Sequence, residues 1–336
     1  MISMRHATAD ARRARHPQRA LLAVLTLLAI ASGAQAQTWP DKTTRFVVPF
    51  PAGGVLDVLT RTVAEALQGS SGKTIVVENL PGAAGNIGID KVARAAADGA
   101  TVLFVPQGNI TINATLLPNS PFKWERDFAP VTLLAYAHNV WVVHPSVAAR
   151  NAAEFIALAK AQPGKLNYAS PGNGSSLHMI GELLAHEAKL DIMHVPYKGT
   201  TPALQDLIGG QVQAMFGALP TLLPAIKAGQ VRALAVTTAK RADQLPDVPT
   251  LAEAGIKGID VPSWYGVMLP AATPPALVAR VQTALSAAIA QPAVRDRLLA
   301  QGLIPVANSP ADFAAQIQRE TATWAAIIRE RKIRAD

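Results

Sequence analysis

The segment "VVPFPAGGVLDVLTR", residues 47–61, places a Pro-Ala-Gly-Gly turn between an apolar run and an amphipathic run. The apolar run predicts a buried strand, and the second run predicts a helix with Asp57 in its first turn. Glycine at such a turn lets backbone N–H groups approach a ligand closely, and a helix N-terminus favours an anion. The segment therefore predicts an α/β fold with strand-to-helix loops suited to a small negatively charged ligand.

The same alternation continues along most of the chain. Strands are expected at 45–50, 74–79, 101–106, 139–145, 166–170, 192–197, 212–219 and 232–238. Helices are expected at 55–67, 87–97, 152–162, 176–189, 201–209 and 221–228, and three more at 275–290, 293–301 and 310–332. Asn151 and Ser309 have the positions of N-caps. Near-continuous apolar strands that alternate with helices predict mainly parallel sheets with helices on both faces.

The arrangement of these segments predicts two α/β lobes joined by two crossing segments, which is a clamshell. Residues 37–138 and 262–336 are expected to form lobe 1, and residues 139–261 are expected to form lobe 2 as an insertion. Ligands of open α/β sheets bind outside the carboxyl ends of the strands, so the loops after the strands should face the cleft.

Residues 1–36 have the features of a secretory signal peptide. A basic stretch precedes the apolar run at 20–31, and Ala34-Gln35-Ala36 matches the cleavage site. The alternative is an uncleaved membrane anchor, but spanning a bilayer takes about 20 apolar residues. Five arginines and one aspartate in this segment account for four of the eight net positive charges, so the mature chain carries +4. We therefore predict an exported, periplasmic protein.

Composition excludes several classes of function. The 50% apolar and 16% charged content indicate a folded globular chain. No Lys/Arg cluster interleaved with aromatic residues follows the predicted signal peptide, so nucleic acid is not an expected partner. The absence of cysteine rules out disulfides and cysteine-based catalysis or metal binding.

Five loops carry the candidate chemistry: 49–57, 78–88, 105–113, 168–178 and 195–206. They lack the P-loop pattern and G-x-G-x-x-G, so a carboxylate suits them better than a nucleotide phosphate. The carboxylate of Asp57 has two possible roles. It either stabilises the helix dipole, or acts directly by anchoring the glycine loop or by holding a polar ligand group or a water.

The sequence supports a catalytic site or a metal site less well than a carboxylate-binding site. Ser175 or Ser176 with His178 is the only hydrolase candidate, and no G-x-S-x-G elbow supports it. His178, Glu182 and His186 share a helix face, but the pattern HExxH is absent, so no metal is expected. Lys198 either binds a carboxylate or is exposed at a helix start. Trp264 and Tyr265 either pack in the hinge or line the cleft.

Five ordered motifs together resemble the Bug (TctC) family, the periplasmic solute-binding proteins of tripartite tricarboxylate transporters. They are "WPDKTTRFVVPFPAGGVLDVLTR", "VVENLPGAAGNIGIDKVARAAADG", "LNYASPGNGSSLHMIGELL", "HVPYKGTTPALQDLIGGQVQAMF" and "LPDVPTLAEAGI". The resemblance covers essentially the whole mature chain. It implies a two-lobed periplasmic-binding-protein (Venus flytrap) fold, a monomer without catalysis or cofactor, and membrane permease subunits as partners.

The resemblance also implies the ligand-binding residues and the ligands. In lobe 1 these are Phe50, Ala52, Gly53, Gly54 and Asp57 in the first loop, and Gln107 and Asn109 in the third; in lobe 2 they are Ser170, Gly172, Asn173, Gly174, Ser175 and Ser176. The implied ligand is a di- or tricarboxylate, or an aromatic acid. Gly217 stands where some members that bind amino acids carry aspartate, which favours a ligand without an amino group. The alternatives to transport are an exported serine hydrolase and a ligand-presenting sensor component.

Overall fold

The computed structural model describes residues 38–334, so the predicted signal peptide lies outside the described part of the chain. Each predicted strand and helix has a counterpart there, with ends that differ by a few residues. The strands are β1 (Thr44–Val48), β2 (Ile75–Asn79), β3 (Thr101–Pro106), β4 (Phe128–Ala137), β5 (Asn139–Val143), β6 (Asn167–Ser170), β7 (Met193–Pro196), β8 (Ala214–Ala218), β9 (Arg232–Val236), β10 (Ser263–Pro270) and β11 (Leu303–Pro305).

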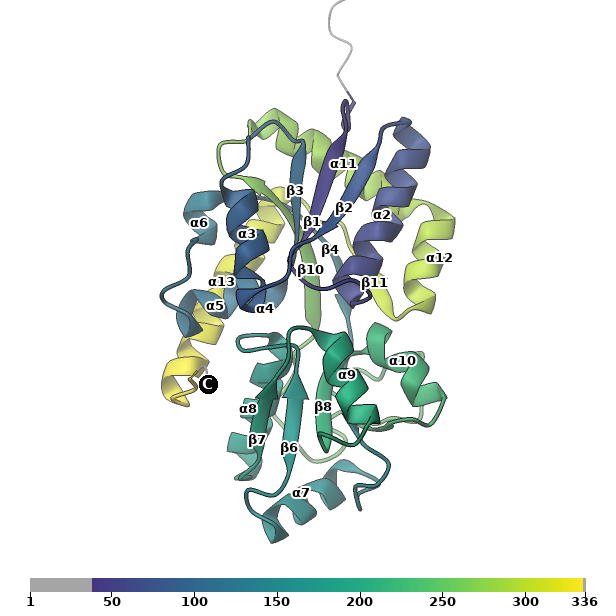
Figure 1. The fold of residues 1–336 in the computed structure, drawn as a ribbon, viewed down its shortest axis with the longest axis vertical. Helices are drawn as coiled ribbons and strands as arrows, with labels where there is room; N and C mark the ends of the chain where they lie inside the picture. The colour runs from purple at the N-terminus through teal and green to yellow at the C-terminus, as the bar shows by residue number, and fades with distance from the viewer. Residues whose placement is uncertain (1–37, 335–336) are drawn as a thin grey trace, which may run out of the picture. The chain divides into compact units, whose positions relative to one another are not determined.

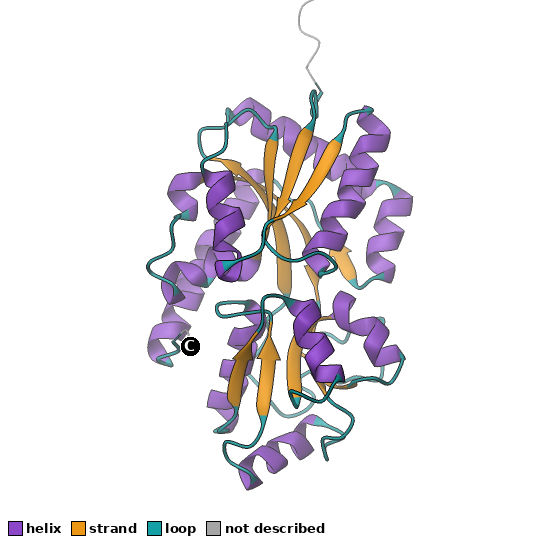
Figure 2. Cartoon of the chain, viewed as in Figure 1, coloured by secondary structure: helices purple, strands orange, loops and turns teal. Residues whose placement is uncertain are grey.

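The helices cover the faces of the sheets, as Figures 1 and 2 show. They are α2 (Val55–Ser71), the 3-10 turn η1 (Ala83–Gly85), α3 (Asn86–Ala93), α4 (Gln107–Thr111), α5 (Asn113–Leu116), α6 (Trp124–Asp127), α7 (Ala152–Ala161), α8 (Ser176–Ala188), α9 (Thr200–Ile208), α10 (Leu219–Lys227), α11 (Pro275–Ala290), α12 (Pro292–Ala300) and α13 (Pro310–Glu330). In the described residues, no helix has both the length and the apolar character that crossing a membrane requires.

The strands form two sheets. The six-stranded sheet has the order β11-β4-β10-β3-β1-β2, and the five-stranded sheet has the order β7-β6-β8-β5-β9. Strands β1, β2 and β3 pair in parallel in the first sheet, and β6 pairs in parallel with β7 and β8 in the second. The predicted α/β fold with two sheets is therefore present.

The expectation that parallel pairs would predominate is wrong, because both sheets are mixed. Strand β10 pairs antiparallel with β3 and β4, and β5 pairs antiparallel with β8 and β9. The reason lies in the crossing segments. The chain leaves the six-stranded sheet through β4 to enter the five-stranded sheet, and it returns through β10. The two strands therefore run in opposite directions beside each other.

The change of sheet falls at the predicted crossings. β4 ends at Ala137 and β5 begins at Asn139, while β10 begins at Ser263. The described residues from Trp39 onward nevertheless form one compact unit by their contacts. The division into lobes at 138/139 and 261/262 therefore stays a prediction. Each lobe consists of one of the two sheets with its flanking helices.

Candidate functional site

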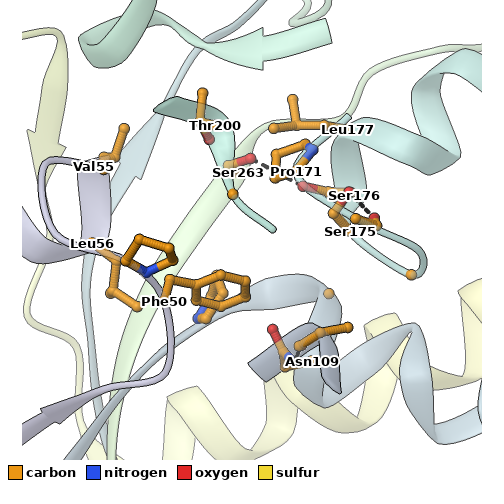
Figure 3. Close-up of a pocket in the computed structure, with 18 of the residues that line it drawn as sticks. Phe50, Val55, Leu56, Asn109, Pro171, Ser175, Ser176, Leu177, Thr200 and Ser263 are labelled. Carbon is orange, nitrogen blue, oxygen red and sulfur yellow. Dashed lines mark hydrogen bonds between the residues drawn. The ribbon is translucent and has the colours of Figure 1, made fainter. Parts of the chain in front are cut away.

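Loops from both sheets meet around one cavity of about 90 Å³. Figure 3 shows Phe50 and Leu56 on one side of it, Ser176 and Ser263 on another, and Asn109 on a third. Nine of the thirteen predicted binding residues line this cavity: Phe50, Gly54, Asp57, Asn109, Gly172, Asn173, Gly174, Ser175 and Ser176. The other four, Ala52, Gly53, Gln107 and Ser170, are not among its lining residues.

Asp57 holds the glycine loop in place. Its Oδ2 accepts a hydrogen bond from the Gly53 N–H at 3.0 Å, and Arg61 Nε donates to the same oxygen at 3.0 Å. Asn79 Nδ2 donates to Asp57 Oδ1 and to the Phe50 carbonyl, each at 3.0 Å. The backbone of Gly53 has φ +84°, a conformation that side-chain-bearing residues rarely adopt. The structure therefore shows the loop-anchoring role among the readings considered for Asp57.

The electrostatics of Asp57 agree with this role. Burial by itself would raise the pKa of Asp57, but hydrogen bonds from Arg61, the Gly53 N–H and Asn79 outweigh it and hold the pKa below its usual value. The carboxylate is therefore charged at neutral pH and paired with the Arg61 guanidinium.

Gln107 points toward the C-terminal helix. Its Nε2 donates to Glu320 Oε2 at 2.8 Å, and Trp264 Nε1 donates to the same oxygen at 2.7 Å. Trp264 is fully buried and Tyr265 lines the cavity, so the two aromatic residues divide the packing and lining roles that were expected for them as alternatives.

Ser170 supports the lobe 2 loop from within. Its hydroxyl accepts a hydrogen bond from the Gly172 N–H at 3.1 Å and lies 2.7 Å from His194 Nε2. The side chain is fully buried. Ser170 would therefore affect ligand binding indirectly, by fixing the conformation of the 170–175 loop.

The two serines proposed as alternative nucleophiles have structural partners. Ser175 Oγ accepts from the His178 backbone N–H at 3.1 Å and donates to the Gly172 carbonyl at 2.8 Å. Ser176 Oγ lies 3.0 Å from Ser263 Oγ. The His178 ring accepts at Nδ1 from the Gly174 N–H at 3.3 Å. These contacts cap a helix and shape a loop, and they form no nucleophile–base pair of the kind a hydrolase uses.

The helix face with His178, Glu182 and His186 forms no metal centre. His178 Nε2 lies 3.9 Å from Glu182 Oε1, and His186 Nδ1 contacts the Arg331 guanidinium. Across residues 38–334, no group of three His, Asp or Glu side chains is placed to hold a metal ion.

Several lining residues were absent from the predicted site. They include Leu56, Ala84, Asn113, Leu177, Thr200, Thr201 and Ser263. Thr200 and Thr201 begin α9, within the segment 195–206, one of the five candidate loops, so the Gly-Thr-Thr sequence at a helix start was the available signal. Ser263 carries no local signal, because it reaches the cavity only through the return crossing. Lys198, by contrast, is exposed and does not line the cavity.

Two helix N-termini of opposite lobes face the cavity without side-chain caps. Helix α2 follows Gly54 and α9 follows Gly199, and neither N-cap residue makes a side-chain hydrogen bond. Their first backbone N–H groups have no partner within the helix, and the helix dipoles place partial positive charge there. Pro51 lies near Gly199, because a Cβ built on Gly199 would be 3.4 Å from Pro51 Cδ.

The charge of the lining is otherwise small. Of the described residues around the cavity, none is lysine, arginine or histidine, and Asp57 is neutralised by Arg61. Much of the remaining wall is apolar, formed by Phe50, Val55, Leu56, Leu177 and Tyr265. The cavity can therefore bind an anion through backbone N–H groups and hydroxyls, beside an apolar wall.

Comparison with known proteins agrees with this geometry. The family model described as "Tripartite tricarboxylate transporter family receptor" (TctC) matches residues 59–333. Rpa4515 from R. palustris, solved with adipate, is 34% identical with a TM-score of 0.86, over 89% of this chain and 100% of that one. The periplasmic binding protein BugD is 32% identical with a TM-score of 0.84, over 89% and 100%.

A third solved structure is MatC (Rpa3494) from Rhodopseudomonas palustris with bound malate. It is 33% identical with a TM-score of 0.82, over 86% of this chain and 100% of that one. The family and these structures are those of solute-binding receptors, so the prediction of a binding protein without catalysis is confirmed. The chain belongs to the TctC family of tripartite tricarboxylate transporter receptors, the family that its motifs resemble.

Proposed function

We propose that this protein is a periplasmic receptor that binds a small carboxylate in the cavity between its two sheets. The single observation that supports this most is the pair of uncapped helix N-termini, α2 and α9, which face one cavity from opposite sides. Their N–H groups provide hydrogen-bond donors for an anion where the described lining has no cationic side chain. The relatives solved with adipate and malate bind ligands of this chemical class.

The proposed contacts divide between the lobes. The first turns of α2, after Gly54, and of α9, after Gly199, are proposed to hold a carboxylate group. Asn109, Asn173 and the loop from Gly172 to Ser176 are proposed to contact the rest of the ligand. Ala52, Gly53, Gln107 and Ser170 would act by shaping these loops. The apolar wall favours a ligand with a hydrocarbon body over one hydroxylated along its length.

The chain is proposed to reach the periplasm by its N-terminal signal, with cleavage after Ala36. Mass determination of the exported protein should then give a chain that begins at Gln37. A mature chain that keeps residues 1–36 would contradict this. The loaded receptor is proposed to be a monomer that delivers its ligand to the membrane permease subunits of a tripartite transporter; the match to the receptor family of such transporters supports this proposal.

Calorimetry on the exported protein tests the ligand class. The panel comprises adipate, malate, citrate, benzoate and glutamate, and adipamide serves as the uncharged control for adipate. We expect at least one acid without an amino group to bind with a micromolar Kd, about −8 kcal/mol, with adipate ahead of malate. Adipamide should bind much more weakly, because it offers no charge to the helix N-termini. No detectable binding of any acid, or binding of adipamide as tight as that of adipate, would overturn the proposal.

A further inference from the structure

We propose that Gly108 is the residue that permits the two lobes to close on the ligand, because its missing side chain leaves room for the 172–175 loop of the opposite lobe. The inference rests on the proposed function, since it concerns how the same cavity is closed. Gly108 lies in α4, directly after β3 of the six-stranded sheet, whereas the loop follows β6 of the five-stranded sheet.

The contact is very close. A Cβ built on Gly108 would lie 2.4 Å from the Gly174 carbonyl oxygen and 3.0 Å from Ser175 Cα. It would also lie 3.2 Å from the Ser176 backbone nitrogen. All of these neighbours are main-chain atoms, which cannot turn away as the end of a flexible side chain can. Any side chain at 108 would therefore push the loop, and the lobe that carries it, away from α4.

The backbone gives no other reason for glycine at this position. Gly108 lies in a helix, and its φ is outside the positive range that favours glycine. Alanine is the better helix former, so local stability alone would favour a side chain. Gly174, on the other side of the contact, has φ +73°, and a Cβ there would lie 1.7 Å from Asn113 Oδ1. Both sides of the contact are thus glycine, and both residues line the cavity.

The opposite edge of the cavity is less tight. There, a Cβ on Gly199 would lie 3.4 Å from Pro51 Cδ, and one on Gly53 would lie 3.9 Å from Thr201 Oγ1. These are ordinary contact distances, whereas a Cβ on Gly108 would overlap main-chain atoms of the opposite lobe, so closure on the α4 side depends on the absent side chain of Gly108. A ligand that bridges the lobes binds in the closed form, and its apparent Kd rises as that form becomes less populated.

The test compares Gly108→Ala with Gly69→Ala. Gly69 also lies in a helix without a positive φ, but a Cβ there would meet nothing within 4 Å. Kd is measured by calorimetry with the acid that the wild type binds, and unliganded unfolding temperature checks the fold. Closure is measured as the distance between spin labels at Lys73→Cys and Lys160→Cys, two exposed sites on different lobes of a chain with no cysteine of its own.

Gly108→Ala is expected to raise Kd by about tenfold or more and to reduce the ligand-induced shortening of the label distance. Gly69→Ala should match the wild type in both measurements. Wild-type Kd and wild-type shortening in Gly108→Ala would overturn the inference. So would a Gly108→Ala chain that fails to fold, since Gly108 would then be required for folding.

Failure of the proposed function has a different signature, which is a wild type that binds no acid of the panel. The label distances of the unliganded proteins then decide the inference alone. Gly108→Ala should lose the population with the shortest distances, and an unchanged distribution would overturn it.

Discussion

Asp57 is the residue with the most specific role in the lobe 1 loop, because one carboxylate joins Gly53, Arg61 and Asn79. Asp57→Asn should lower the free energy of unfolding by about 1.5–3 kcal/mol, the value of hydrogen bonds to a charged group. Because the folded-state pKa of Asp57 is lowered, this stabilisation is present above the unfolded value of about 3.9 and is lost as pH falls through the folded-state pKa.

Urea unfolding of wild type and Asp57→Asn from pH 7 down to pH 2 measures this difference. The two curves of stability against pH should converge below about pH 4. Asp98→Asn is the control, because Asp98 also has a lowered pKa but pairs with Lys42, outside the cavity lining. It should leave the Kd for the acid unchanged, whereas Asp57→Asn should raise it. An equal effect of both variants on Kd would contradict the anchoring role.

Helices α8 and α13 allow a prediction at the level of elements, because both begin with a serine N-cap. Ser175 accepts from the His178 N–H at 3.1 Å, and Ser309 accepts from the Asp312 N–H at 3.1 Å. Loss of either cap, in Ser175→Ala or Ser309→Ala, should lower the free energy of unfolding by about 0.5–2 kcal/mol. Only Ser175→Ala should also raise Kd, because Ser175 lines the cavity and holds the Gly172 carbonyl. Calorimetry that finds the wild-type Kd for Ser175→Ala would contradict this.

Helix α13 connects the cores of the two sheets, in addition to the connection through β4 and β10. The first half of this helix places Phe313 and Ile317 in the core beside the six-stranded sheet, with Trp264. Its second half places Trp324 and Ile328 in the core of the five-stranded sheet, with Trp141. It then ends beside α8, where Arg331 pairs with Glu187 (Figure 1). One helix therefore belongs to two cores, which couples the stability of the two sheets.

Trp324→Ala tests this coupling. The substitution should cost about 3–5 kcal/mol, and hydrogen exchange should become faster in peptides from both sheets, β3 and β6 among them. Phe155→Ala is the matched control. It removes a buried ring from the same core, on α7, whose buried residues all lie in that core. Its effect should be concentrated in the five-stranded sheet. Exchange that rises only there in Trp324→Ala would contradict the coupling.

The sequence by itself determined most of the elements and the chemistry of the loops, whereas β4, β10, β11 and the short helices α4, α5 and α6 were not among the elements expected. Apolar runs of strand length and helical periodicity depend on near neighbours, so the positions of β1 and α2, or the Asn151 and Ser309 caps, could be read locally. The glycine and serine loops that line the cavity were predictable for the same reason, since a βα turn and a helix N-terminus are built from consecutive residues.

The tertiary structure alone decided the mixed pairing of the sheets and the direction of individual side chains. Gln107 was expected at the ligand but donates to Glu320, which lies 213 positions later in the chain. Ser263 enters the site from the return crossing, and the contact of Gly108 with Gly174 joins two lobes. Each of these depends on a partner distant in sequence, and no local pattern encodes which distant atoms will be neighbours once both sheets have packed.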